Sequence, residues 1–215
     1  MEVNVHRDRI RVYPPKIVMY QTQLYHSPEE YLALEIDAEY KSEYHNGQIV
    51  PMAGGTPNHN QIAGNLYAAL NFALKRQPYR VFIGDMRLWI PQQRFYTYPD
   101  VMVVSDQLQF VEGRKDTITN PSLIVEVLSE STENYDRGEK FRLYRTIPSF
   151  QEYILIEQSE MHIEQYSKTA SSQTATSQWL FSEYDGETAT LALTTIQFQI
   201  SLSDIYDKVE FDVEE

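Results

Sequence analysis

The sequence predicts an α/β protein in which helices flank a mixed central sheet, and two observations support this fold class. Between residues 56 and 157, apolar patterns follow one another in the order helix, strand, strand, strand, helix, strand. The stretch 122–128 is apolar at nearly every position, as is typical of a strand buried on both faces. We therefore expect an N-terminal arm over 1–26, a main domain over 27–167, and a C-terminal β extension over 168–215 that packs on the same domain.

Local signals define the elements that precede this core. The arm has no clean period, and we expect only a short strand at 17–20 within it. Ser27 is followed by Pro28 and, three residues after the serine, by Glu30, which is the pattern of a capped helix start. Asn46-Gly47 then separates two strand-like runs, and this dipeptide predicts a tight hairpin.

A long helix is predicted from Thr56-Pro57 to about Gln77. Its apolar stripe has helical spacing and consists of Ile62, Leu66, Ala69, Leu70 and Ala73. His59 lies one turn earlier on the same stripe. Two strands should follow at 79–90 and 95–104, joined by the turn 91–94.

After the buried strand 122–128, a helix should run from about Glu133 to Ile147, where Pro148 ends it. The remaining predicted elements are strands at 152–157, 161–167, 178–184 and 188–202, and a helical turn at 203–207. The polar loop between 167 and 178 and the acidic C-terminal end should be mobile.

The bulk composition restricts the classes of function. The chain has no cysteine, which excludes disulfides and thiolate metal sites and makes a reducing cytoplasm its expected setting. It has neither a signal peptide nor an apolar run of membrane-spanning length, so no membrane association is expected. The net charge is −13, from 18 Lys and Arg against 31 Asp and Glu. This balance disfavours tight non-specific nucleic-acid binding but allows a local basic patch.

Three charged residues are predicted to point inward. Strand alternation places Asp100 on the same face as Met102, and Glu126 on the same face as Ile124. An ionised Glu126 in an apolar strand is costly to desolvate, so a metal ion, a cation or a second carboxylate must share its charge. Lys140, on the helix that follows, is a candidate partner. We expect burial to raise the pKa of Glu126 and Lys140 to lower it.

The element order, with Pro-Asp on one strand, an acid on the next and a basic helix after it, resembles the PD-(D/E)XK nuclease superfamily. The chain resembles the Uma-two family of restriction endonucleases more closely, in the segments HNGQIVPMA, PNHNQIAGNL, YPDVMVV, IVEVLSEST, DRGEKFRLYR and SFQEYILIE. The resemblance covers about 27–167 and implies a restriction-endonuclease-like fold. It also implies cleavage of DNA phosphodiester bonds with Mg²⁺, or Mn²⁺ in its place. The oligomeric state is open, and a homodimer is expected because nucleases that cut duplexes often act as dimers.

The resemblance also assigns roles to residues. Asp100 and Glu126 would hold the metal together with the backbone carbonyl of Val127, since Mg²⁺ prefers oxygen ligands. Leucine stands at 128, where the superfamily pattern has a lysine, so the catalytic lysine would be Lys140. Glu43 would lie beside these ligands. From the residues alone, Glu43 reads as an ordinary hairpin residue and Asp100 as an exposed turn carboxylate at the start of a strand.

Further residues and other functions remain open. His59 is either a core-edge histidine or a neighbour of the ligands. Arg137 is expected to be a solvated helix residue, with a phosphate contact as its alternative role. Lys140 and Glu126 could form a structural ion pair without metal. The protein could then be an inactive binding or scaffold protein with a nuclease fold, and a nuclease that acts on RNA is a third alternative.

Overall fold

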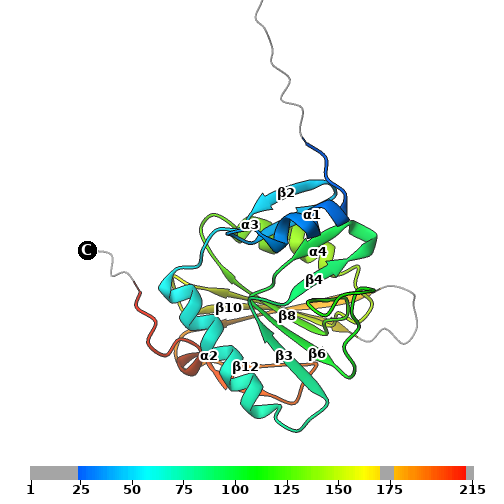
Figure 1. Cartoon of the computed structure of the whole chain (residues 1–215). Coiled ribbons are helices and arrows are strands. Elements are labelled where there is room, and N and C mark those ends of the chain that lie inside the picture. Colours follow the sequence, from blue (N-terminus) through cyan, green and yellow to red (C-terminus); the bar gives the residue numbers. More distant parts are fainter. Residues whose placement is uncertain (1–23, 170–176, 212–215) are drawn as a thin grey trace, which may run out of the picture.

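A computed structural model of the 215-residue chain describes residues 24–169 and 177–211 as two large β-sheets and a two-stranded hairpin, with helices packed against them (Figure 1). The helical segments are α1 (Pro28–Ile36), α2 (Pro57–Ala73), η1 (Pro91–Gln93), α3 (Glu133–Tyr135), η2 (Asp136–Lys140), α4 (Phe141–Tyr144) and α5 (Leu202–Ile205). No helix within these ranges is both long and apolar enough to cross a membrane. The predicted strand at 17–20, most of the predicted mobile loop and the acidic end lie outside the described residues.

The larger sheet has six strands in the order β11-β10-β9-β8-β6-β3. These strands are β3 (Tyr79–Ile83), β6 (Val101–Ser105), β8 (Leu123–Leu128), β9 (Glu152–Glu157), β10 (His162–Thr169) and β11 (Gln178–Asp185). β8 and β9 pair in parallel through the helical segments between them, and the other neighbours are antiparallel, so the mixed sheet is confirmed. The boundary predicted after residue 167 falls inside β10, and β11 continues the same sheet.

The alternation of side chains in this sheet separates two hydrophobic cores. Val103 and Val125 face a core formed with α2 and α5, whereas Met102 and Ile124 face a core formed with α4 and the second sheet. β8 is buried at every position, as its composition predicts. Helices therefore flank the sheet, with α2 in front of it in Figure 1 and α3 and α4 behind it.

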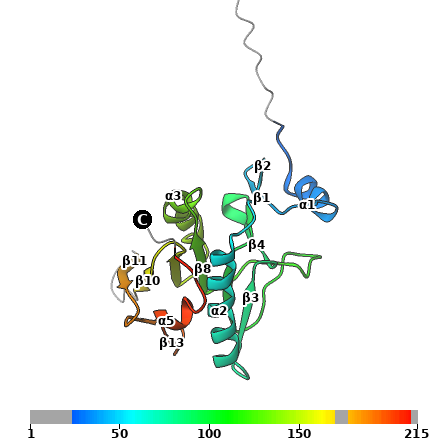
Figure 2. The same cartoon turned by 90° about the vertical axis from the view of Figure 1, so that its left-hand side faces the viewer.

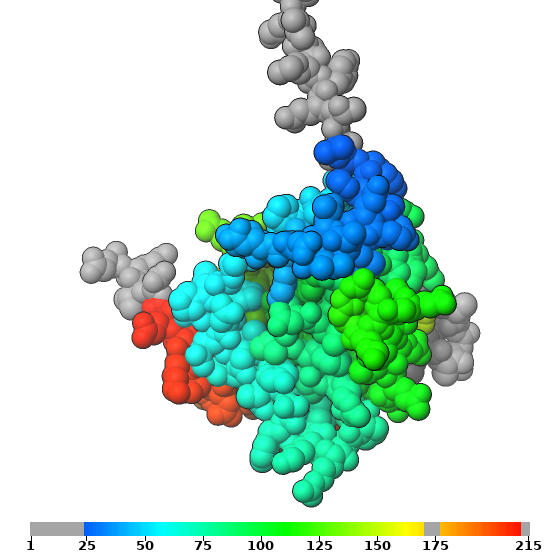
Figure 3. All heavy atoms as spheres, in the orientation of Figure 1, coloured from blue at the N-terminus to red at the C-terminus, as the bar shows by residue number. Residues whose placement is uncertain are grey.

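The second sheet, which the sequence did not reveal, has the order β2-β1-β5-β4-β7. Its strands are β1 (Ser42–His45), β2 (Gln48–Pro51), β4 (Arg87–Ile90), β5 (Phe95–Thr97) and β7 (Thr117–Ile118). The predicted helix 28–36 and the hairpin at Asn46-Gly47 are both confirmed, and this region covers one end of the molecule (Figure 3).

The two long strands predicted at 79–90 and 95–104 are wrong as single strands, because each is divided between the two sheets. One crossing lies at Gly84, whose φ of 64° is in the region that favours glycine. The other lies at Pro99, which has no N–H to donate to a ladder. The crossings are adjacent, since the Gly84 N–H donates to the Asp100 carbonyl at 3.0 Å. The chain thus bends twice at one place, and Asp100 lies there.

Two predicted helices also differ in detail. The first ends at Ala73 rather than near Gln77, because the chain turns through a left-handed residue, Arg76, before β3. The second contains a π-helical turn, η2, between α3 and α4, and it ends at Tyr144. Hydrophobic periodicity alone does not reveal such a π turn, and these turns are frequent at functional sites.

The predicted strand 188–202 is wrong, because this segment forms a hairpin of β12 (Thr190–Ala192) and β13 (Gln199–Ser201). The buried carboxylate of Glu152 on β9 explains the turn. It accepts hydrogen bonds from the backbone N–H groups of Thr194 and Thr195, at 2.9 and 3.0 Å, and from the Thr195 hydroxyl at 2.6 Å. The segment then continues into α5, and Asn65 on α2 donates to the carbonyl of Ile205 at 2.9 Å. Figure 3 shows the C-terminal segment against α2.

Because Glu152 satisfies several donors of the C-terminal hairpin, we predict that Glu152→Ala destabilises the whole fold. Hydrogen bonds to charged groups contribute about 1.5–3 kcal/mol each, and the loss leaves buried donors unpaired. Urea unfolding should therefore show a loss of about 3 kcal/mol, within the usual range for a buried polar network. Glu160→Ala, at an exposed glutamate, is the control. Equal stability of the two variants would contradict this role of Glu152.

Candidate active site

The candidate site lies where the two sheets separate. Asp100 follows the crossing at Pro99 and immediately precedes β6, whose Val101 is opposite Val125 of β8. The Asp100 carboxylate accepts a hydrogen bond from the Val127 N–H at 2.7 Å. Strand alternation placed Asp100 on the face of Met102 and Glu126 on the face of Ile124, and the resemblance implied that the two acids lie together. The structure brings them together on neighbouring strands.

Lys140 lies in a cluster of carboxylates. Its ammonium nitrogen is 2.9 Å from Asp136 Oδ1, 3.2 Å from Glu126 Oε1 and 3.6 Å from Glu43 Oε1. All four side chains are at least nine-tenths buried. The helix-borne lysine therefore reaches the buried acid of β8, and the resemblance placed it there despite the leucine at 128.

The environment of Glu126 changes its ionisation. Burial raises the pKa of Glu126 to about 8, an effect that Lys140 opposes and Asp100 reinforces. The Tyr144 hydroxyl, one helical turn after Lys140, donates to Glu126 Oε1 at 2.6 Å. Burial lowers the pKa of Lys140, but the attraction of Glu126, Glu43 and Asp136 outweighs it and raises that pKa well above its ordinary value. Lys140 is therefore protonated at neutral pH.

Glu43 belongs to the second sheet and is fixed by two hydroxyl groups. The Thr97 hydroxyl donates to its Oε1 at 2.5 Å, and the Tyr135 hydroxyl donates to its Oε2 at 3.0 Å. Thr97 ends β5, and Tyr135 immediately precedes the π turn. Glu43 therefore joins the second sheet to the helix that contains Lys140, and it lies beside the site as the resemblance implies.

His59 contacts the site from the first turn of α2. Its Nε2 is 3.1 Å from Asp100 Oδ2, and its Nδ1 is buried without a hydrogen-bond partner among the described residues. Burial lowers the pKa of His59, but the hydrogen bond to Asp100 prevails and raises it. A Cβ atom at Gly55 would lie 2.7 Å from Nδ1, so glycine is required there for the ring to fit. His59 is thus a neighbour of Asp100 and not merely a core-edge residue.

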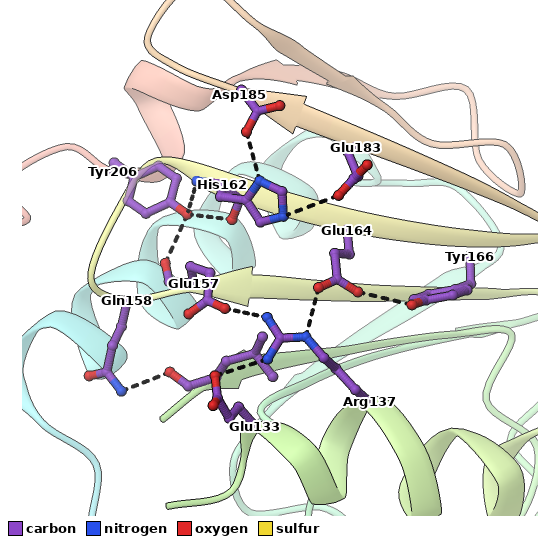
Figure 4. A network of polar contacts seen from close by, with 11 residues as sticks. Glu133, Arg137, Glu157, Gln158, His162, Glu164, Tyr166, Glu183, Asp185 and Tyr206 are labelled. Atoms are coloured by element: carbon purple, nitrogen blue, oxygen red, sulfur yellow. Dashed lines mark hydrogen bonds and ion pairs between the residues drawn. The ribbon is translucent and has the colours of Figure 1, made fainter. Parts of the chain in front are cut away.

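Arg137 is not the solvated helix residue that the sequence suggested. Its guanidinium donates to Glu164 at 2.7 Å, to Glu133 at 3.0 Å and to Glu157 (Figure 4). The contacts join the helical segment of Lys140 to β9 and β10. Three carboxylates already engage this guanidinium, which argues against a phosphate contact.

Sequence reasoning missed Asp136 and Tyr144. Asp136 is buried, and its Oδ1 approaches Lys140 but has no hydrogen bond of good geometry. Both residues lie four positions from Lys140, so helical spacing places all three on one face. That spacing was the available signal, but the charged run DRGEK resembles a solvent-exposed turn.

The charge balance of the site fits a bound cation. Four carboxylates surround the site, on Asp100, Glu126, Glu43 and Asp136, and the ammonium of Lys140 is the one buried cation among them. Among the residues that the structure describes, no three His, Asp or Glu side chains already converge as a metal cluster. Mg²⁺ does not require such a cluster, because it usually binds through one or two carboxylates and keeps water and substrate phosphate as its other ligands.

Comparison with known proteins identifies the family of this chain. The family model Uma2, described as "Putative restriction endonuclease", matches residues 28–203. The chain belongs to the Uma2 family. A Synechocystis sp. protein called "Uncharacterized protein sll1609" is 44% identical over 160 residues, which cover 74% of this chain and 88% of that protein. A second, "Uncharacterized protein slr1290" from the same organism, is 37% identical over 187 residues, 86% of this chain and 93% of that protein.

A solved structure shares the fold of this Uma2 protein. It is described as a putative nuclease belonging to DUF820 from Anabaena variabilis, and it superimposes with a TM-score of 0.66. The match covers 83% of this chain and 96% of the other, at 19% sequence identity. The mixed α/β fold is thus the fold of that structure.

The network in Figure 4 predicts a pH dependence of stability. His162 Nδ1 is 2.7 Å from Asp185 Oδ1; burial lowers the pKa of His162, but this contact prevails and raises it. Because His162 binds its proton more tightly in the folded state, protonation stabilises the fold at pH values below the unfolded-state pKa of about 6.5. This stabilisation is lost as the pH rises through the pKa of His162 in the folded state. Asp185→Asn should therefore destabilise the protein at about pH 5.5 and have hardly any effect at about pH 9. The loss at the lower pH should be less than about 1 kcal/mol, because Asp185 is exposed.

Thermal unfolding at both pH values measures this difference, with Glu187→Gln, at an exposed acid on the turn that follows β11, as the control. An equal loss of stability in Asp185→Asn at both pH values would show that His162 is not responsible.

Proposed function

We propose that this Uma2 protein is a metal-dependent endonuclease that hydrolyses DNA phosphodiester bonds. One observation supports the proposal above others: the Lys140 ammonium lies 2.9–3.6 Å from three buried carboxylates on elements from both sheets and the helix, and Asp100 lies beside them. Buried charge of this kind is costly for stability alone, and perturbed groups gather at functional sites.

The proposed roles follow from the contacts. Asp100 and Glu126 would hold Mg²⁺, with the backbone carbonyl of Val127 as a further ligand. When bound, the ion would polarise the phosphate and lower the pKa of a coordinated water molecule. His59 and the Val127 N–H would fix the Asp100 carboxylate, and Tyr144 would fix Glu126. These supporting contacts hold the ligands in place before substrate arrives.

Lys140 would act as a charge and not as a base. Its raised pKa keeps the ammonium protonated, so it has protons to donate to the attacking water or to a phosphate oxygen. A fixed positive charge where negative charge develops stabilises the transition state. Glu43 and Asp136 would hold the ammonium in position.

Several properties of the proposed enzyme remain predictions. Mn²⁺ should replace Mg²⁺, and a homodimer would place one site on each strand of a duplex. The expected setting is the reducing cytoplasm.

An inactive scaffold is the second candidate, and the charge of the chain favours it. A net charge of −13 repels a polyanion, and the cluster around Lys140 could serve only as a buried ionic network. Plasmid DNA that stays uncut with every divalent metal would make this candidate the better account. A nuclease that acts on RNA would instead cut an RNA strand and leave the plasmid intact.

We predict that Lys140→Ala abolishes most cleavage of plasmid DNA at saturating Mg²⁺ while the variant remains folded. Removing one partner of a buried ion pair costs roughly 3–5 kcal/mol, so its melting temperature should also fall. Lys208→Ala, at an exposed lysine, is the control for both measurements. Normal cleavage by the folded Lys140→Ala variant would exclude a catalytic role for this lysine. A lower melting temperature with normal cleavage would leave it a structural role alone.

We predict that Glu126→Gln weakens Mn²⁺ binding, measured by calorimetry. The change keeps the shape of the side chain and removes its negative charge. Loss of residues that merely support ligands costs about 10–100-fold in affinity, so loss of a ligand should cost at least about tenfold. Glu160→Gln removes an exposed charge and should bind Mn²⁺ as the wild type does. Unchanged binding in Glu126→Gln would refute the metal assignment.

A further inference from the structure

A basic hollow lies between the C-terminal half of α2 and the edge strand β3, which are side by side in Figures 1 and 2. Its volume is about 770 Å³. Three cations line it, Lys75, Arg76 and Arg80, and no Asp or Glu is among its lining residues. This surface is therefore locally positive, although the chain as a whole has a net charge of −13.

The cations of the basic hollow have no carboxylate partners within the described part of the chain. Arg80 donates only to the carbonyl of Tyr79, at 3.0 Å. Of the other described cations, six are held in ion pairs, namely those of Lys41, Arg87, Arg114, Arg137, Lys140 and Arg142. Arg94, Lys115, Arg145, Lys168 and Lys208 are in no ion pair with a described carboxylate either. The basic hollow differs from these because three such cations line one surface. The backbone N–H of Asp106 donates a hydrogen bond to the carbonyl of Pro78, but Asp106 lines a different hollow. The basic hollow thus presents uncompensated positive charge.

Aromatic side chains complete the lining. Tyr67 and Tyr79 pack against the core, so burial accounts for their presence. Phe72 is different, because it is 81% exposed and contributes little to the core. An exposed ring next to free cations is the combination that single-stranded nucleic acids use, with phosphates on the cations and a base stacked on the ring.

We propose that the basic hollow binds an unpaired nucleic-acid strand. The exposed Phe72 ring can stack only on a base that is unpaired and turned outward, which favours a single strand over double-stranded DNA. The choice of nucleic acid over other polyanions rests on the proposed function, whereas the binding itself requires no catalysis.

α2 connects this surface to the candidate active site. His59, in the first turn of α2, contacts Asp100, and the hollow is lined by residues of the same helix from Tyr67 onward. At a rise of about 1.5 Å per residue, the two places are roughly 12–22 Å apart along the helix. A strand bound in the hollow could thus extend along α2 towards the acids.

The test measures binding without cleavage. Fluorescence anisotropy with labelled oligo(dT) of about 20 nucleotides, in EDTA and over a range of salt, reports affinity and its salt dependence. Changing Lys75, Arg76 and Arg80 together to Gln should lower the slope of log K against log salt by about 2, because each phosphate contact contributes about 0.7. Phe72→Ala should weaken binding about 5- to 150-fold and leave the slope unchanged.

Matched variants remove the same charge and the same kind of ring elsewhere. The first control changes Lys115, Lys168 and Lys208 together to Gln, so it has the same net charge as the variant with Lys75, Arg76 and Arg80 changed to Gln. It also includes a change at a left-handed residue, Lys208, which matches the left-handed Arg76. Tyr40→Ala removes another aromatic ring, which is 70% exposed. Both controls should bind oligo(dT) as the wild type does. Glu126→Gln, which changes the candidate active site, should also bind oligo(dT) as the wild type does. The binding measurement therefore tests the basic hollow even if the protein proves not to be a nuclease.

Three results would overturn the proposal. One is a wild-type protein that does not bind oligo(dT) even at about 50 mM salt. Another is an unchanged affinity and slope in both hollow variants. The third is a duplex of the same length that binds more tightly than the single strand and depends on the same cations, which would assign the surface to double-stranded DNA.

Discussion

The buried ammonium of Lys140 is the constraint on which the rest of this structure depends. Asp136, Glu126 and Glu43 come from a helical turn, a central strand and the second sheet, and Lys140 holds all three within 3.6 Å. At an effective dielectric constant of about 20, each contact at about 4 Å contributes about 4 kcal/mol of attraction. Without this cation the acids would repel one another in a buried space, so the packing of these elements would be less stable.

The sheet crossing explains why the acids meet at this position. Residues 79–105 form one long hairpin that is divided between the two sheets. Its inner strands, β4 and β5, belong to the five-stranded sheet, and its outer strands, β3 and β6, belong to the six-stranded sheet. The bend places Asp100 at the start of β6, an interior strand of the six-stranded sheet, and keeps Thr97, three residues earlier, in contact with Glu43. One short segment thus positions acids from both sheets. A straight continuation of either strand would separate them, which gives Gly84 and Pro99 a role in the site although neither has a reactive group.

The sequence predicted the parts of the site that depend on rigid local geometry. The two-residue period of a strand fixes the face that each side chain occupies, so the apolar neighbours of Glu126 were enough to predict that it points inward. The family resemblance was needed to place Asp100 beside it. The reach of Lys140 depends on a π turn, which hydrophobic periodicity does not register. Asp136 was missed for the same reason, and because its neighbours in DRGEK are charged. Glu152 was missed because its partners are backbone N–H groups 42 and 43 residues away, and no local pattern encodes such a contact.

The distribution of charge connects the fold to a polyanionic substrate. Excess carboxylate at the N-terminal end of α2 would repel phosphate. Burial is the main reason that the pKa of Glu126 is raised, and the neighbouring carboxylates of Asp100 and Asp136 raise it further. A divalent cation would balance the acids and attract phosphate at the same point. The opposite end of the same helix carries cations that no described carboxylate neutralises. An acidic protein can therefore bind a nucleic acid if two conditions are met. Its positive charge must be concentrated where the strand lies, and a metal ion must be bound by the carboxylates of the candidate active site.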